Sequence, residues 1–489
     1  MDRASGILMH ISSLPSPYGI GTMGKAAYEY ADFLKSAGQK YWQLLPLGPT
    51  GFGDSPYQSF CSAAGNPYFI DLDMLIDEGI LTRIEVESLD WGDKATAIDY
   101  GILYENRYKV LRTAKVKGWP LYEEQIDEFV NTNNWVKDYA RFMALKEANG
   151  GLAWTDWTIT DFDETMYEDF DLHVFIQYLF YKQWYQLRKY VNNLGIKLIG
   201  DIPIYVPLDS VEVWLEPEQF QLDENLKPLA VSGVPPDQFS DEGQLWGTPL
   251  YDYDHMKSDG YSWWIRRIGA LKEMFDVIRI DHFRGFDAYY SIPYGDKNAI
   301  NGEWIQAPGI DIVRTITQWF YDVDFIAEDL GVQTPSLRAL LEESGLPGMK
   351  ILQYAFIPEK DSSCRPYNIR SNCICYTGTH DNPTLRMWKE DGDKEEILLA
   401  KEYLGISDEN FSDGIIRCGM GTAANLFIAP MQDWLNLGRE GLMNVPQVCG
   451  HGNWTWRMKK NATTDELAER ILRMTKLYGR IKLTEITEI

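Results

Sequence analysis

The chain has 489 residues, which allows two or three average domains or one enlarged domain with insertions. Its 46 Lys and Arg against 72 Asp and Glu give a formal net charge of −26, which argues against nucleic acid and anionic membranes as partners. A neutral substrate fits better, and the 13% of aromatic residues suits sugar rings, although most of these residues belong to a core.

Nothing in the sequence indicates export or a membrane span. The N-terminal apolar run GILMHI is too short for a signal peptide, and no stretch approaches the roughly 20 apolar residues that cross a bilayer. The six cysteines form no CxxC pair and no zinc spacing. We expect a cytoplasmic protein in a reducing compartment, with no membrane partner; the sequence leaves the oligomeric state open.

Short apolar runs closed by polar or Gly/Pro turns alternate with helical patterns, which is typical of parallel β/α units. Eight runs are predicted as strands: 6–11, 41–47, 196–204, 275–283, 323–330, 349–356, 373–380 and 424–431. The fold predicted for residues 1–489 is therefore a single enlarged α/β domain, a (β/α)8 TIM barrel with large, mainly helical insertions between barrel strands.

Two intervals between these strands are longer than one crossover helix requires. After the second strand, residues 50–195 are predicted to form an inserted, mostly helical subdomain, since about 150 residues separate the neighbouring strands. Residues 206–272 form a second insertion, which looks irregular and is rich in Pro, Gly, Asp and aromatic residues. Because long loops in compact enzymes often cover binding sites, this insertion is predicted to contain an active-site loop.

Three of the predicted strands end in an acid. Asp281 ends VIRID, Glu328 ends FIAE, and Asp381 follows CICYTGTH. In a parallel barrel these carboxylates would converge at the C-terminal mouth, where such barrels place their chemistry. This arrangement suits the cleavage of a bond between sugars.

Each acid has a chemical interpretation and a structural alternative. Arg279 shares a strand face with Asp281, so it would lower the pKa of that acid and keep it ionised as a nucleophile; a structural Arg–Asp pair is the alternative. Partial burial would raise the pKa of Glu328 and make it a proton donor, or else it caps the next helix.

The third acid lies in the polar run TGTHDNPT, which could grip ring hydroxyls or could simply form a turn. Asp201, which ends LIGD, is a fourth strand-end acid that either supports the site or caps an element.

Two Asp–His pairs also raise a metal-site interpretation. Asp281–His282 and His380–Asp381 could bind a divalent ion, but neither has HxxxH spacing and Arg279 would add a cation beside the first. The chain also lacks GxSxG, Walker and dinucleotide-binding motifs in a suitable context. We therefore predict no metal and no cofactor.

Over nearly its full length the chain resembles the amylomaltase or disproportionating-enzyme family, the 4-α-glucanotransferases. The matching runs are GILMHISSLPSPYGIG, GFGDSPYQSFCSAAGNPYFI, GDIPIYV, PPDQFSDEGQLWGTPLYDYD, RIDHFRG, AEDLG, YTGTHDNPT and NVPQVCGHGNWTWR. The resemblance implies a retaining transfer of an α-1,4-glucan or maltooligosaccharide segment to glucose or another maltooligosaccharide. We expect no separate C-terminal β-domain, since few residues follow the last run.

By this resemblance Asp281 would be the nucleophile, Glu328 the general acid/base and Asp381 the transition-state stabiliser. The resemblance also implies a set of substrate-binding residues: Tyr57, Gln58, Asp201, Asp237, Gln244, Trp246, Arg279, His282, His380 and Asn382. The alternatives are an α-1,4-glucan hydrolase with the same three acids and a non-catalytic glucan-binding protein.

Overall fold

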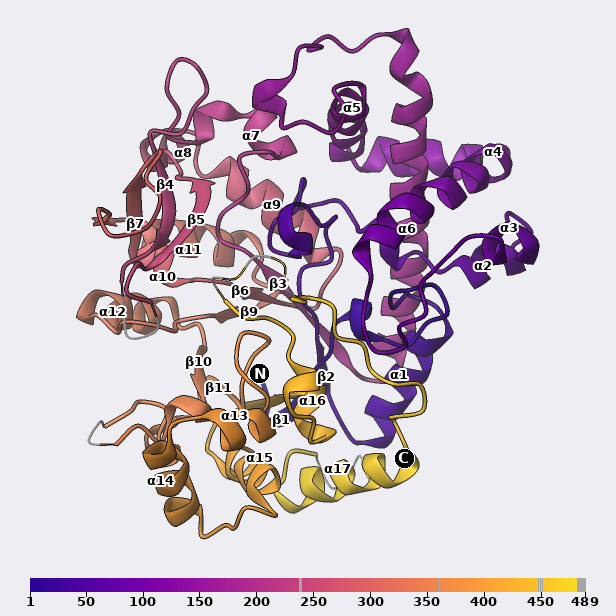
Figure 1. Ribbon diagram of the computed structural model, residues 1–489. Coiled ribbons are helices and arrows are strands. Elements are labelled where there is room, and N and C mark those ends of the chain that lie inside the picture. The colour runs from indigo at the N-terminus through magenta and orange to yellow at the C-terminus, as the bar shows by residue number, and fades with distance from the viewer. Residues whose placement is uncertain (237–239, 359–360, 447, 449, 451, 482–489) are drawn as a thin grey trace.

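The fold is built around eight parallel strands that form one sheet in the order β10-β11-β12-β1-β2-β3-β6-β9 (Figure 1). The computed structural model describes residues 1–236, 240–358, 361–446, 448, 450 and 452–481. The strands are β1 (Ala4–Leu8), β2 (Tyr41–Gln43), β3 (Lys197–Ile202), β6 (Val277–Ile280), β9 (Asp324–Ala327), β10 (Gly348–Ile351), β11 (Cys373–Tyr376) and β12 (Leu426–Pro430). Each overlaps one predicted run, and the predicted α/β barrel with helical insertions is confirmed.

The barrel strands are largely apolar because both of their faces are covered. Every residue of β1, β2, β6, β11 and β12 is buried. Parallel sheets that carry helices on the outside and packed side chains inside have this continuous pattern, in place of alternation. The strands are shorter than the predicted runs, since the last residues of each run lie beyond the strand.

The barrel closes between β9 and β10, the two strands at the ends of the sheet order. The Ala327 backbone N–H donates to the carbonyl of Pro347 at 2.9 Å. The buried carboxylate of Asp329 accepts the Met349 N–H at 2.6 Å and lies 3.4 Å from Nζ of Lys350. Asp329 therefore substitutes for part of the missing strand ladder at this seam.

Residues between β2 and β3 fold into helices that stand on one side of the barrel (Figure 1). They are α2 (Leu72–Asp77), α3 (Arg83–Glu87), α4 (Tyr100–Thr132), α5 (Trp135–Ala148) and α6 (Tyr167–Asn193). The helix α6 leads back into β3, and its buried Phe175 and Trp184 belong to the same core as the barrel strands. This helical layer is thus continuous with the barrel core.

A second, antiparallel sheet of four strands lies beside the barrel in the order β5-β4-β7-β8. Its strands are β4 (Ala230–Val234), β5 (Gln244–Pro249), β7 (Ala288–Pro293) and β8 (Glu303–Gln306). The sequence analysis did not predict this sheet. Its strands are short, β4 and β5 contain Gly or Pro, and half of the sheet comes from chain after β6, so the pairing is non-local.

The remaining helices complete the outer layer of the barrel and the loops above it. They are α1 (Lys25–Ser36), α7 (Val211–Leu215), α8 (Tyr253–Ser258), α9 (Ser262–Lys272), α10 (Arg284–Asp287), α11 (Gly309–Trp319), α12 (Pro335–Ser344), α13 (Leu385–Asp391), α14 (Lys394–Leu404), α15 (Phe411–Gly421), α16 (Met431–Trp434) and α17 (Asp465–Leu477). Within the described residues, no helix combines the length and apolar character needed to cross a bilayer.

Replacement of Asp329 by Ala tests the closing contact. The variant leaves the Met349 N–H without its charged acceptor, so the free energy of unfolding should fall by about 2 kcal/mol. As a control, Asp324→Ala on β9 removes an exposed ion pair to Lys197 on β3, with a nitrogen–oxygen distance of 3.4 Å, and should cost less than about 1 kcal/mol. Urea unfolding of both variants measures the difference; equal losses would show that the Asp329 contact does not stabilise the seam.

Candidate active site

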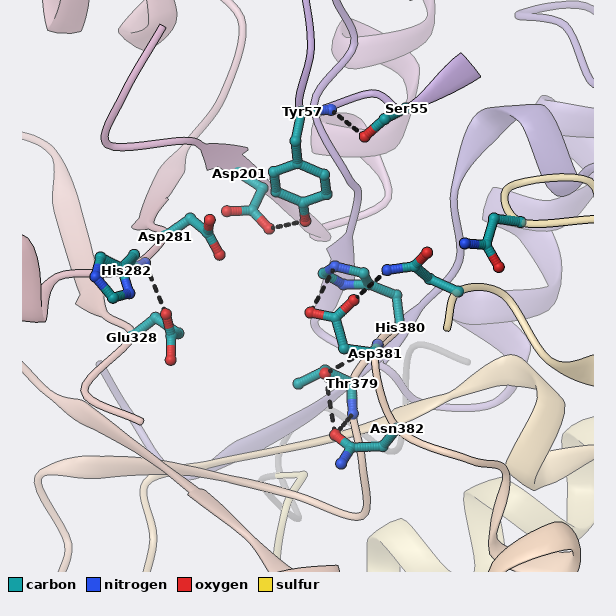
Figure 2. A network of polar contacts seen from close by, with 12 residues as sticks. Ser55, Tyr57, Asp201, Asp281, His282, Glu328, Thr379, His380, Asp381 and Asn382 are labelled. Carbon is teal, nitrogen blue, oxygen red and sulfur yellow. Dashed lines mark hydrogen bonds and ion pairs between the residues drawn. The ribbon is translucent and has the colours of Figure 1, made fainter. Parts of the chain in front are cut away.

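The three predicted acids lie at the C-terminal end of the barrel. Asp281 directly follows β6, Glu328 directly follows β9, and Asp381 lies in the loop after β11. Figure 2 shows the side chains of Asp281 and Glu328 on one side of a common space and that of Asp381 on the other. The barrel therefore brings together carboxylates that are far apart in the sequence.

A buried arginine fixes the orientation of Asp281. Arg279 on β6 is the register partner of Asp201 on β3. Its Nη1 donates to both carboxylate oxygens of Asp201 at 2.6 Å and to Oδ1 of Asp281 at 2.9 Å. Only 3% of Arg279 is exposed, so this positive charge acts with little solvent screening. In the nucleophile candidate Asp281, Oδ1 is thus bound to a cation, and Oδ2 does not take part in that contact.

Three rings from separate loops meet beside this ion pair. The Tyr57 hydroxyl donates to Oδ2 of Asp201 at 2.9 Å, and its ring stacks on His380 with centroids 5.1 Å apart. Trp454 packs against both rings, at 5.8 Å from Tyr57 and 5.7 Å from His380. Burial raises the pKa of Tyr57, so its hydroxyl stays protonated and remains a donor. The stack therefore holds an aromatic surface next to the acids.

Glu328 occupies a different electrostatic environment from Asp281. Its Oε2 accepts the His282 N–H at 2.6 Å and its Oε1 accepts the Leu330 N–H at 3.1 Å. Burial and, after it, the charge of Asp281 raise the pKa of Glu328 to about 8, against the opposing effects of Arg279 and the two N–H donors. At neutral pH Glu328 therefore carries a proton, as a general acid must.

His282 is held in an uncommon conformation between the acids and the second sheet. Its φ is 50°, in the left-handed region that non-glycine residues rarely adopt. Its ring meets Trp246 edge to face at 4.7 Å, and the Trp246 indole N–H donates to Gln244 Oε1 at 3.1 Å. Burial lowers the pKa of His282 to about 4. The imidazole is therefore neutral, and within the described residues its buried Nε2 has no hydrogen-bond partner.

The loop that carries Asp381 is shaped by its own polar side chains. The Asn382 side chain accepts the N–H and the hydroxyl of Thr379 and donates to the Tyr354 hydroxyl at 2.9 Å. Asp381 accepts from Asn444 Nδ2 at 2.7 Å through Oδ1, and its Oδ2 lies 3.3 Å from Nε2 of His380. The Asn382 amide thus contacts protein on both sides, and its contact with substrate stays a prediction.

The other predicted substrate-binding residues are placed as follows. Gln58 is half-buried beside Tyr57 in the same loop, and Gln244 begins β5 next to Trp246. Asp237 lies outside the described residues. Within the described part of the chain, no three His, Cys, Asp or Glu side chains are grouped so as to hold a metal ion.

Two residues at the site were not predicted individually, namely Asn444 and Trp454. Both lie in the run NVPQVCGHGNWTWR, which carried the family resemblance. Neither follows a strand and neither is an acid, so only the resemblance could have pointed to them.

Comparisons with known proteins identify the family of the chain. The family model described as 4-alpha-glucanotransferase, of glycoside hydrolase family 77, matches residues 9–463. The chain is 45% identical to a 4-alpha-glucanotransferase of Clostridium butyricum, over 96% of this chain and all of the relative. It is 42% identical to that of Thermus thermophilus, over 98% of this chain and all of the relative.

Solved structures give the same result. The amylomaltase of Streptococcus agalactiae in complex with acarbose superimposes with a TM-score of 0.95 at 40% identity, over 98% of this chain and all of that one. The amylomaltase of Corynebacterium glutamicum, at 18% identity, shares the fold with a TM-score of 0.77, over 98% of this chain and 74% of that one.

Because Glu328 is buried, we expect the stability of the folded protein to depend on pH. Its pKa is about 8 in the folded protein, and about 4.3 is normal for an unfolded chain. The folded state is therefore favoured by the protonated acid at low pH, and this contribution is lost as the pH rises through 8. Glu328→Gln cannot ionise. Its melting temperature should therefore rise relative to that of the parent as the pH increases from 5 to about 9.

The exposed Glu303→Gln serves as the control, and its difference from the parent should not change over the same range. Thermal melts at several pH values measure both. A Glu328→Gln difference that is independent of pH would contradict the raised pKa.

Proposed function

The chain belongs to the 4-alpha-glucanotransferase family and is an enzyme of that activity, and we propose that it works by a retaining double displacement with a covalent intermediate on Asp281. One observation supports this more than any other. Arg279 binds Asp281, while burial keeps the neighbouring Glu328 protonated. The site thus contains one carboxylate bound to a fixed cation and one carboxylic acid, as a retaining mechanism requires.

In the first step Asp281 attacks the anomeric carbon of an α-1,4-linked glucose unit. The bond from that carbon to the glycosidic oxygen breaks, and Glu328 transfers its proton to the departing oxygen. The product is a β-linked glucosyl ester on Asp281 and a shortened glucan with a free 4-hydroxyl. This step predicts that the two carboxyl groups lie roughly 5 to 5.5 Å apart, since no water fits between nucleophile and sugar.

In the second step the ionised Glu328 accepts the proton of an acceptor 4-hydroxyl, whose oxygen attacks the same carbon and displaces Asp281. Two inversions restore the α configuration, and the enzyme returns to its starting protonation state. Glu328 thus acts first as acid and then as base.

The remaining polar groups would hold the sugar between the two steps. Asp381 would bind hydroxyls of the distorted ring, since its carboxylate is partly exposed toward the space shared with the other acids (Figure 2). By the family resemblance, the neutral His282 would bind another hydroxyl. Both roles rest on placement at the site and on the family resemblance.

Transfer exceeds hydrolysis only if an acceptor sugar reaches the intermediate before water does. We attribute this preference to aromatic surfaces on two sides, Trp246 against His282 and Tyr57 stacked on His380. Stacking holds a glucose ring in place and displaces solvent from the same volume.

For substrates, we propose α-1,4-glucans and maltooligosaccharides as donors and glucose or maltooligosaccharides as acceptors. A net charge of −26 agrees with a neutral polymer and disfavours nucleic acid as a partner. A cytoplasmic location stays a prediction.

Trp246→Ala tests the aromatic surface with maltotriose as sole substrate. The parent should produce glucose and a ladder of longer oligosaccharides with the number of reducing ends unchanged, because transfer conserves them. Loss of the indole admits water, so the variant should release several-fold more new reducing ends per transfer event.

Trp319→Ala provides the control, because it removes a side chain at the end of α11 that is 63% exposed. Its ratio of hydrolysis to transfer should match that of the parent. Chromatography of the products together with a reducing-end assay measures the partition. An unchanged ratio in Trp246→Ala would remove this residue from the explanation.

A further inference from the structure

The loop that carries Asp381 spans residues 377–384, between β11 and α13. Its interior is fixed by Asn382, as described above, and by Gln353, whose amide donates to the Pro383 carbonyl at 2.8 Å. These contacts set the shape of the loop. They leave open what fixes its two ends relative to the barrel.

A single buried carboxylate binds both ends of this loop. Oδ2 of Asp433 accepts the hydroxyl of Thr377 at 2.6 Å, at the first residue after β11. Oδ1 of Asp433 accepts the backbone N–H of Leu385 at 2.8 Å, at the first residue of α13. The chain segment between these two contacts contains His380 and Asp381.

Asp433 lies in a rigid, buried part of the fold. It lies in α16 directly after β12, the strand that pairs with β11. Only 3% of the residue is exposed, and the neighbouring Trp434 is 1% exposed. The carboxylate is therefore attached to the barrel wall beside the strand from which the loop emerges.

Helix capping does not account for Asp433. The N-cap of α13 is Thr384, whose hydroxyl accepts the Met387 N–H. Within the described residues, no salt bridge joins Asp433 to a basic side chain, and burial raises its pKa to about 6 against the two hydrogen bonds. A buried carboxylate without a cation is costly to fold, so a role in geometry explains it better than a role in stability.

We propose that Asp433 is a positioning residue for Asp381, holding both ends of the loop so that the acid meets the sugar in the transition state. This rests on the proposed role of Asp381. Because Asp433 is bonded to the loop at Thr377 and at Leu385, its loss removes one contact at each end and lets the loop shift, although the Thr384 hydroxyl still donates to the Leu437 carbonyl at 2.7 Å. A displacement of about 1 Å in a catalytic group can cost a hundredfold in rate.

The chain offers a matched control in Asp71, the N-cap of α2. Its carboxylate also accepts a threonine hydroxyl, that of Thr22 at 2.6 Å, and a helical N–H, that of Met74 at 3.0 Å. It is 6% exposed. Asp71→Ala therefore removes the same pair of contacts from a buried site in another part of the fold.

The experiment compares Asp433→Ala, Asp433→Asn and Asp71→Ala in maltotriose disproportionation, at a temperature where circular dichroism shows all three folded. Both alanine variants should lower the melting temperature. Only Asp433→Ala should lower kcat, by about 10- to 100-fold, with KM within about twofold of the parent. The amide of Asp433→Asn can still accept from Leu385 and donate to Thr377 Oγ1, so this variant should recover most of kcat.

Two results would overturn the proposal: a kcat of Asp433→Ala equal to that of Asp71→Ala, or an Asp433→Asn variant as slow as Asp433→Ala. Asp381→Ala, assayed in parallel, separates this failure from that of the proposed function. If Asp381→Ala keeps the kcat of the parent, the role assigned to Asp381 fails. If it is inactive while Asp433→Ala is not, only the positioning role fails.

Discussion

Arg279 places one positive charge between two carboxylates at the C-terminal end of the barrel, and the arrangement of the site depends on it. Without this guanidinium, Asp201 and Asp281 would be two acids brought close together by neighbouring strands. With it, Asp201 becomes an acceptor for Tyr57, which in turn stacks on His380 beside Asp381. A single buried cation thus connects β3 with the loops after β2, β6 and β11.

The same arrangement places Asp281 and Glu328 in different electrostatic environments. Asp281 contacts the guanidinium. Glu328 is buried close to the charge of Asp281, and these two effects raise the pKa of Glu328 to about 8. The His282 backbone, in its left-handed conformation, donates to Glu328 while its side chain packs on Trp246. One strained residue therefore links the general acid candidate to the aromatic wall from the second sheet.

Much of this architecture could be predicted from the sequence, because the barrel strands are largely apolar runs and several of them lead into acids. That pattern located β6, β9 and β11, and with them Asp281, Glu328 and Asp381. The antiparallel sheet could not be found in this way, since β4 pairs with β7, which lies beyond β6 in the chain. Asn444 and Asp433 could not be found either, because their contacts to the Asp381 loop join segments about 50 to 60 residues apart, a separation that no local period encodes.

The central claim is that Asp281 becomes covalently bonded to the sugar while Glu328 moves the proton. The most direct measurement is mass spectrometry of Glu328→Gln incubated with an α-maltosyl fluoride, whose leaving group needs no acid and whose intermediate would then lack a base for its release. The account predicts a maltosyl group on the peptide that contains Asp281. Consumption of the fluoride with the sugar on another residue, or on none, would contradict it.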